Sequence, residues 1–179
     1  TSPLLPLEEL PLFKSIFADA LDAGLLTSLE EGKSIASLAA LADRLEKPFE
    51  ASLESLKDTD AVLSLELDLV DEHQVAGFFV KRQLMEGTRL IVADSAKNRL
   101  MENTASTLPL KAGEEKDFLS LLLSAVKDGT EDQALKEAAE TLKKAEKPCI
   151  VYGETFAANA DETALDTLLE LAETLNASL

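Results

Sequence analysis

Short apolar runs separated by helical stretches constrain the fold of this chain more than any other feature of its sequence. Three of these runs are AVLSLEL at 61–67, RLIVAD at 89–94 and PCIVYG at 148–153. They are shorter than typical helices and contain few polar residues, which is typical of strands buried on both faces of a parallel sheet. We therefore predict a three-layer α/β fold, with a mostly parallel sheet of about 4–5 strands and helices on both faces.

The stretches between these strands carry helix signals. A helix is predicted over 74–86, where Gly87 ends it. A second is predicted over 114–128, with acidic residues in its first turn and Gly129 after its last. Both the acids and the glycine are favoured by the helix dipole and by C-terminal capping geometry.

Two further helices and one edge strand complete the predicted pattern. Thr130 with Gln133 is expected to cap the helix that precedes the last strand, and Asp161 is expected to cap the final helix. The run STLPLK at 106–111 is expected to be an edge strand, because Pro109 cannot donate a hydrogen bond to a neighbouring strand.

The N-terminal part is predicted to be rich in helix. Apolar residues at helical spacing occupy 12–21, and Gly24 is expected to end that helix. Thr27 and Glu30 have the spacing of a capping box, and KSIASLAALADRLE at 33–46 again has helical periodicity.

We predict two parts, a helix-rich segment over 1–47 that packs on the same domain and a Rossmann-like α/β domain over 48–179. The sequence starts with Thr1 rather than Met, which indicates a fragment excised from a larger protein. The expected partners are accordingly the rest of the parent polypeptide or other oxidoreductase subunits.

The charge of the chain excludes several classes of partner. Its 34 acidic and 17 basic residues give a net charge of −17, without a cluster of Lys or Arg. Such a surface repels nucleic acids and anionic membranes. No apolar run approaches the roughly 18 residues of a transmembrane helix, so we expect no membrane span and a cytoplasmic location.

Cysteine and histidine chemistry is limited because each residue occurs once, as Cys149 and His73. This chain alone cannot form a disulfide, a CxxC redox pair or a cysteine-ligated zinc or iron–sulfur site. Cys149 lies in an apolar run and is expected to be a buried, inert thiol. No nucleophile elbow accompanies His73, so a Ser-His-Asp relay is not expected.

Acidic residues cluster where the strand at 61–67 should end, in LSLELDLVDEH at 63–73. The carboxyl ends of parallel strands are where α/β proteins bind ligands, so these acids are candidates for Mg²⁺ or Ca²⁺ ligands. The alternative, which we favour in so acidic a chain, is a solvated acidic rim without a metal. No GxGxxG or GxxxxGK[ST] motif supports a nucleotide site. The acids considered are Glu66, Asp68, Asp71, Glu72 and Asp94.

From Ser52 to Leu179 the order of segments resembles the middle α/β domain of molybdopterin-dependent oxidoreductases, the group of formate dehydrogenase α-subunits and the large iron–sulfur subunit of NADH–quinone oxidoreductase. In that family a strand ending in G-x-N-P is followed by H-P and a helix. An I-V-x-D-P-R strand end and an L-P-x-x-P-G-[ST]-[DN] loop come next. LSLELDLVDEH, LIVADSAK and LPLKAGEEKDFLSLLL occupy these places.

The last third of the chain, ALKEAAETLKKAEKPCIVYGETFA, resembles the family's helix, A-x-x-P, strand and Y-G unit. This unit alone also resembles the central domain of thiamine-diphosphate enzymes. The residues 52–128 favour the molybdopterin family.

The resemblance implies that three loops line a pocket for molybdopterin guanine dinucleotide. In the first loop, Glu66 replaces the glycine, Asp68 the asparagine and Leu69 the proline. The second loop keeps its aspartate as Asp94 but has Ser-Ala in place of Pro-Arg. Glycine lets backbone N–H groups approach a pyrophosphate, whereas Glu66 adds a side chain and a negative charge.

The third loop keeps Gly113, but Glu114 and Glu115 replace the hydroxyl residue and the Asp or Asn. His73 matches the family's histidine, with a role at the start of a helix as the simpler interpretation. We therefore predict no catalytic residue, no metal ligand and no bound cofactor in this chain, unless the family site is retained. The matched loop positions are Glu66, Asp68, His73, Asp94, Gly113, Glu114 and Glu115.

Three hypotheses follow. The leading one is a domain of a formate dehydrogenase-like or quinone-oxidoreductase-like protein that has lost its pterin site and serves as scaffold or docking part of an electron-transfer complex. The second is a working half of a molybdopterin guanine dinucleotide pocket in an active oxidoreductase. The third is a cation-binding module that uses the acidic strand ends. In each case the chain alone is not expected to be catalytic.

Overall fold

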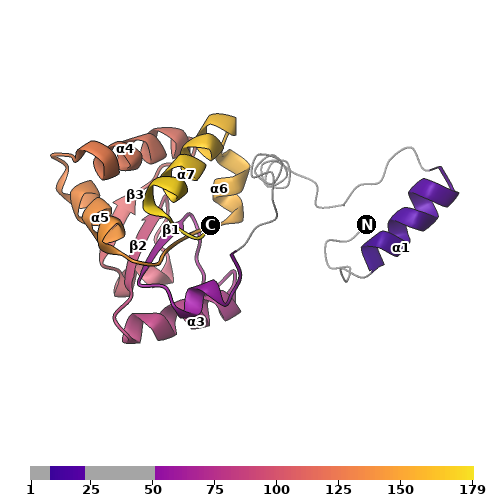
Figure 1. The fold of residues 1–179 in the computed structure, drawn as a ribbon, viewed down its shortest axis with the longest axis horizontal. Helices are drawn as coiled ribbons and strands as arrows, with labels where there is room; N and C mark the ends of the chain where they lie inside the picture. Colours follow the sequence, from indigo (N-terminus) through magenta and orange to yellow (C-terminus); the bar gives the residue numbers. More distant parts are fainter. Residues whose placement is uncertain (1–8, 23–50) are drawn as a thin grey trace.

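The computed structural model describes residues 9–22 and 51–179. Its centre is a four-stranded parallel sheet with the strand order β3-β2-β1-β4 (Figure 1). The strands are β1 (Ala61–Leu65), β2 (Arg89–Asp94), β3 (Ser106–Pro109) and β4 (Pro148–Tyr152). All five residues of β1, the most central of the apolar runs, are buried, as predicted for a strand covered on both faces.

Helices cover both faces of this sheet, which confirms the predicted fold class. One face packs against α4 (Glu115–Asp128), α5 (Gln133–Lys144), α6 (Glu154–Asn159) and α7 (Glu162–Leu175), whose apolar residues join those of the strands in the larger core. The other face is covered by α3 (Gln74–Met85) and the short 3₁₀ helices η2 (Ser55–Lys57) and η3 (Arg99–Asn103), around a smaller core. Figure 1 shows α3 on the opposite side of the sheet from α4 and α7.

The parallel strand order places the loops that follow β1, β2 and β3 at one edge of the sheet. The chain leaves β1 through α3 to β2, continues to β3, and then crosses through α4 and α5 to reach β4 on the far side of β1. Every strand is parallel, so every strand ends at the same edge of the sheet. In open parallel sheets, ligands bind outside these carboxyl ends.

The N-terminal helix α1 (Glu9–Lys14) continues into the π-helical turn η1 (Ser15–Ala20). This confirms a helix where the apolar spacing predicts one. Its apolar residues Leu12, Ile16 and Phe17 are exposed. The expected capping box and the helix expected over 33–46 lie outside the described residues, as does the glycine expected to end the first helix.

Several local predictions need correction. The first strand ends at Leu65, because Glu66 adopts a left-handed conformation that a strand cannot continue. Asp132, and not Thr130, caps α5 by accepting a hydrogen bond from Leu135 N–H at 3.0 Å. The six-residue helix α6 was not predicted, because it is too short to show a helical period.

Other predicted ends are confirmed. Asp161 caps α7 by accepting a hydrogen bond from Ala164 N–H at 2.8 Å. Gly129 follows α4 with a positive φ of 85°, a conformation in which glycine avoids the strain of a side chain. β3 is an edge strand of the sheet, as Pro109 indicates.

Candidate functional site

The candidate site begins at Glu66, the first residue after β1. Its N–H donates to Ala93 C=O of β2 at 2.8 Å, and its φ of 44° turns the chain out of the strand. The side chain points inward: Glu66 is only 4% exposed. Neither carboxyl oxygen has a hydrogen-bond partner among the described residues. A buried carboxylate without partners is costly, so its environment favours the neutral acid.

Burial and neighbouring carboxylates raise the pKa of Glu66 to about 7. Loss of solvation is the largest cause, followed by repulsion from Glu115, and Asp94 adds to it. The Ser95 hydroxyl lies near enough to lower the pKa in part, although it forms no hydrogen bond of normal geometry with Glu66. The site can therefore hold a proton at neutral pH, and it is unfavourable for anions.

Glu115 supplies the second buried carboxyl group from the first turn of α4. It is 2% exposed, and its Oε1 accepts a hydrogen bond from Gly113 N–H at 2.9 Å. Gly113 has a φ of 86°, which suits a glycine at this turn. Glu114 is exposed and forms an ion pair with Lys111 at 3.5 Å. Of the two adjacent glutamates, only Glu115 faces Glu66.

The remaining acids after β1 bind the backbone of their own loop and Arg99 at the start of η3. Asp68 Oδ1 accepts from Val70 N–H at 3.0 Å, and its Oδ2 accepts from Arg99 N–H at 3.0 Å. Glu72 Oε1 accepts from Asp68 N–H at 3.0 Å, and Asp71 pairs with the Arg99 guanidinium at 3.1 Å. These carboxylates hold a turn in place and do not converge on a common centre.

Asp94, the last residue of β2, also accepts hydrogen bonds from neighbouring groups. Its Oδ1 accepts from Ala96 N–H at 2.9 Å, and its Oδ2 accepts from the Asn98 side-chain amide at 2.7 Å. Asn98 in turn caps η3 by accepting from Leu100 N–H. The residue thus has the strand-end capping role that its position indicates, while its charge still acts on Glu66.

Two glycines that the sequence analysis did not single out hold the loop after β1 from both sides. A Cβ at Gly153 would lie 2.2 Å from Glu66 C=O, and a Cβ at Gly77 would lie 2.5 Å from Leu69 C=O. Both distances are too short for any side chain. The signal for Gly77 was a glycine inside a helix, which often marks a close backbone approach.

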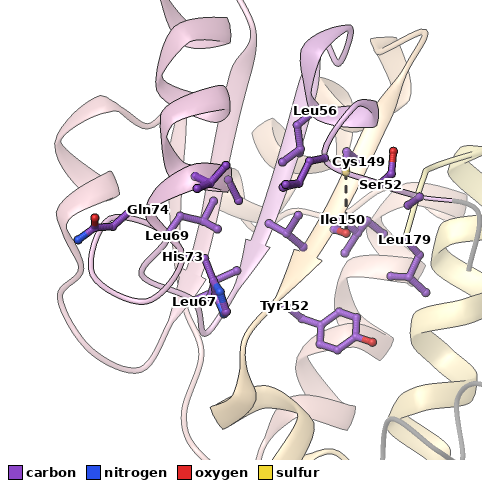
Figure 2. Close-up of a pocket in the computed structure, with 15 residues that line it drawn as sticks. Ser52, Leu56, Leu67, Leu69, His73, Gln74, Cys149, Ile150, Tyr152 and Leu179 are labelled. Carbon is purple, nitrogen blue, oxygen red and sulfur yellow. Dashed lines mark hydrogen bonds between the residues drawn. The ribbon is translucent and has the colours of Figure 1, made fainter. Parts of the chain in front are cut away.

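His73 lies elsewhere, at the rim of an apolar groove of about 530 Å³ (Figure 2). It is exposed and precedes α3, where its C=O accepts from Gly77 N–H. The groove is lined by leucines of the loop after β1 and by residues of β4, and neither Glu66 nor Glu115 lines it. The structure therefore separates His73 from the pair of buried carboxyl groups.

Within residues 9–22 and 51–179, no group of three or more His, Cys, Asp or Glu side chains is arranged to hold a metal ion. In the same part of the chain, no helix has the length and apolarity needed to span a bilayer. Cys149 is a free, buried thiol, as expected, and burial raises its pKa to about 11.

Comparison with solved structures gives a similar fold in the formyltransferase/hydrolase complex (FhcABCD) from Methylorubrum extorquens in complex with methylofuran. The TM-score is 0.64 at 18% identity, over 84% of this chain and 42% of that chain. This chain thus spans less than half the length of that neighbour. A search of curated proteins finds no match.

The sequence profile of the molybdopterin oxidoreductase family matches residues 1–178, which is nearly the whole chain. This agrees with the order of strand-end loops that suggested the family from the sequence. The chain belongs to the molybdopterin oxidoreductase family.

Proposed function

We propose that this chain is a domain in which the pterin site of the family has been closed by its own carboxyl groups, and that it serves as a scaffold or docking part of a cytoplasmic, multi-subunit oxidoreductase-related complex. The formate dehydrogenase-like or quinone-oxidoreductase-like subtype and the electron-transfer role belong to this proposal. The observation that carries it is the buried, unpartnered carboxyl group of Glu66 at the position of a family loop glycine.

The electrostatic argument rests on the charge that a dinucleotide would bring. Its pyrophosphate is dianionic, and above about pH 7, where Glu66 is ionised, two unit charges about 4 Å apart repel by about 4 kcal/mol at an effective dielectric of about 20. That energy corresponds to roughly a thousandfold loss of affinity. Glu115 lies close enough to Glu66 to raise its pKa by repulsion. A second acidic group therefore faces the place where the pyrophosphate would lie.

The residues present therefore do not fit an anionic cofactor. Where a family member would offer backbone N–H groups and an arginine, this chain offers Glu66 and, at the second loop, Ala96. The N–H of Glu66 is already bonded to Ala93 C=O, and that of Gly113 to Glu115. Donors that a phosphate would need are thus bonded within the protein.

A docking role is supported by apolar side chains that the chain leaves in solvent. On α3, Val75, Phe78 and Met85 lie on one side of the helix, and Phe78 and Met85 are 60% and 89% exposed. Large exposed apolar side chains grouped on one element are typical of interaction surfaces. The solved neighbour is itself part of a complex, which agrees with this role.

A titration of the purified chain with GDP, a guanine nucleotide that carries a pyrophosphate, tests the closed-site proposal. We expect no binding at micromolar concentrations. At about pH 8, where Glu66 is ionised, the double variant Glu66→Gly, Glu115→Gln removes both buried carboxyl groups and is expected to bind at least about tenfold more tightly, because each removed charge relieves repulsion. Glu114→Gln is the matched control, since Glu114 is exposed, and should bind like the unmodified chain.

Stoichiometric binding of GDP by the unmodified chain, or molybdenum copurifying with it, would contradict the proposal. Either result would favour the alternative, in which the domain supplies a working half of a molybdopterin guanine dinucleotide pocket. That alternative is supported by Gly113, which keeps its left-handed turn, and by Asp94, which keeps its place at the strand end.

A further inference from the structure

The carboxyl groups of Glu66 and Glu115 face each other in a nearly dry space at the strand ends. Both side chains are almost fully buried, and the oxygens of Glu66 lack a hydrogen-bond partner among the described residues. Asp94 and the Ser95 hydroxyl also act on Glu66 from the end of β2, and neither brings a positive charge. Glu154, which follows β4, is exposed. Such a pair is stable when it holds a proton, because two buried like charges repel.

The acids around this space differ in how firmly they are held. The backbone of Glu66 is fixed, since its N–H is bonded to β2 and its C=O packs against Gly153. Asp94 accepts two hydrogen bonds, from the backbone and the amide side chain of the loop that follows it. Within the described part of the chain, the Glu115 side chain accepts one hydrogen bond, from Gly113 N–H at 2.9 Å. Glu115 is therefore the group that repulsion displaces most easily.

Gly113 belongs to the turn 111–114, which leads into α4. All four residues of this turn are exposed. Glu114 N–H donates to Lys111 C=O at 2.9 Å, and the two side chains form an ion pair at 3.5 Å. Both contacts lie inside the turn, and an exposed ion pair adds little stability. The bond from Gly113 to Glu115 is thus what ties the turn to a buried group.

We propose that a proton held by the carboxyl groups of Glu66 and Glu115 controls the turn 111–114. While the proton is present, Glu115 stays buried and its bond to Gly113 keeps the turn in place. When the proton leaves to solvent, two negative charges face each other, the Glu115 side chain moves outward and the turn is released. A single hydrogen bond to an exposed turn contributes little beside the cost of two buried like charges.

The release falls near neutral pH. The pKa of Glu66 is raised to about 7, by burial first and by Glu115 second, so the turn is ordered below that pH and mobile above it. The response requires only the two carboxyl groups and does not depend on the loss of the pterin site. Binding of GDP and mobility of the turn therefore test separate statements, and either can fail alone.

Backbone order parameters from ¹⁵N NMR relaxation of the full chain measure the mobility of the turn. For Ala112 and Gly113 we expect values of about 0.85 at about pH 5.5, typical of rigid backbone, and below about 0.6 at about pH 8.5. The midpoint should lie near pH 7. Gly153, whose N–H is bonded to Leu65 C=O, is the internal reference and should stay rigid at both pH values.

Two variants test the cause of the response. Glu66→Gln and Glu115→Gln each remove one member of the pair, so both should keep the turn rigid at either pH. In Glu115→Gln the amide oxygen can still accept from Gly113 N–H. Glu114→Gln is the matched control, because it changes an exposed acid of the same turn, and it should show the response of the unmodified chain.

Equal order parameters of the turn at both pH values in the unmodified chain would overturn the proposal, since the charge would then be relieved elsewhere. The same loss of order in either neutral variant would also overturn it, because the pair would not be the cause. Loss of order at Gly153 together with the turn would show a general loosening of the domain and would equally refute a local response.

Discussion

Replacing Glu66 by glutamine gives the sharpest test of the buried carboxyl pair. The pKa of Glu66 is raised from an ordinary value of 4.5 to about 7, by burial first and by Glu115 second. One pKa unit corresponds to about 1.4 kcal/mol, so the ionised form destabilises the folded state by about 3 kcal/mol at high pH. Glutamine has the same shape without the charge, so it does not incur this cost.

The direction of the pH dependence of stability follows from the pH range in which Glu66 ionises in the folded and in the unfolded chain. Below pH 4.5 the group is protonated in both the folded and the unfolded chain, so Glu66 costs nothing as a charge. Between pH 4.5 and about 7 the unfolded chain ionises while the folded chain keeps its proton, so stability falls as pH rises. Above about pH 7 Glu66 is ionised in both states, and the stability that it contributes no longer changes with pH.

Urea unfolding of the unmodified chain and of Glu66→Gln gives the free energy of unfolding at each pH. The advantage of the variant should grow by about 2 kcal/mol between about pH 5.5 and about pH 8.5, because stability falls with rising pH until Glu66 ionises in the folded chain near pH 7 and is then constant. Titration of groups that do not interact with Glu66 cancels in the difference between the two proteins. Glu114→Gln, at an exposed site, should show no such pH dependence.

A second variant checks the cause of the effect. Glu115→Gln keeps an acceptor for Gly113 N–H but removes the charge that repels Glu66, so the pKa of Glu66 should fall. In that background the advantage of Glu66→Gln should be smaller. A stability difference between Glu66→Gln and the unmodified chain that is the same at both ends of the pH range would refute the buried-charge reasoning.

Three further predictions concern other parts of the domain. Gly153→Ala should lower the free energy of unfolding by about 2 kcal/mol or more, since its Cβ would meet Glu66 C=O at 2.2 Å; an unchanged Tm would contradict this close contact. Asp161→Ala should cost about 1 kcal/mol through loss of the α7 cap, measured by urea unfolding, and a neutral effect would mean that the cap is not formed. Cys149, with its pKa raised to about 11, should react with Ellman's reagent at about pH 8 at least about a hundredfold faster in urea than in the native protein; rapid native reaction would show an accessible thiolate.

The sequence predicts the strands of the sheet because they are short apolar runs, although it places their ends less well. The run 89–94 corresponds to β2 residue for residue. The run 61–67 is two residues too long, because Leu67 is buried like a strand residue although Glu66 has already left the strand. A run of apolar residues indicates burial. Burial alone does not distinguish a strand from the tightly packed loop that follows it.

The candidate site is only partly predictable. The resemblance to the family marks Glu66 and Glu115, but it also marks Glu114, which is exposed. Helical spacing relates Glu115 to Phe118 and Leu119 on the buried face of α4, and that spacing could have separated the two glutamates. The hydrogen bonds that occupy the other acids of the loop depend on the folded turn, which the sequence does not reveal.

The contacts of Gly153 and Gly77 with the loop after β1 also bear on how such a domain evolves. Backbone atoms of both glycines pack directly against this loop, so main-chain contacts fix its position together with the hydrogen bonds of Asp68 and Glu72. Side chains at the rim can therefore change, and a binding capacity can be lost or regained, while the main-chain frame and the stability of the sheet stay the same. A fold can in this way be kept while the chemistry at its loops changes.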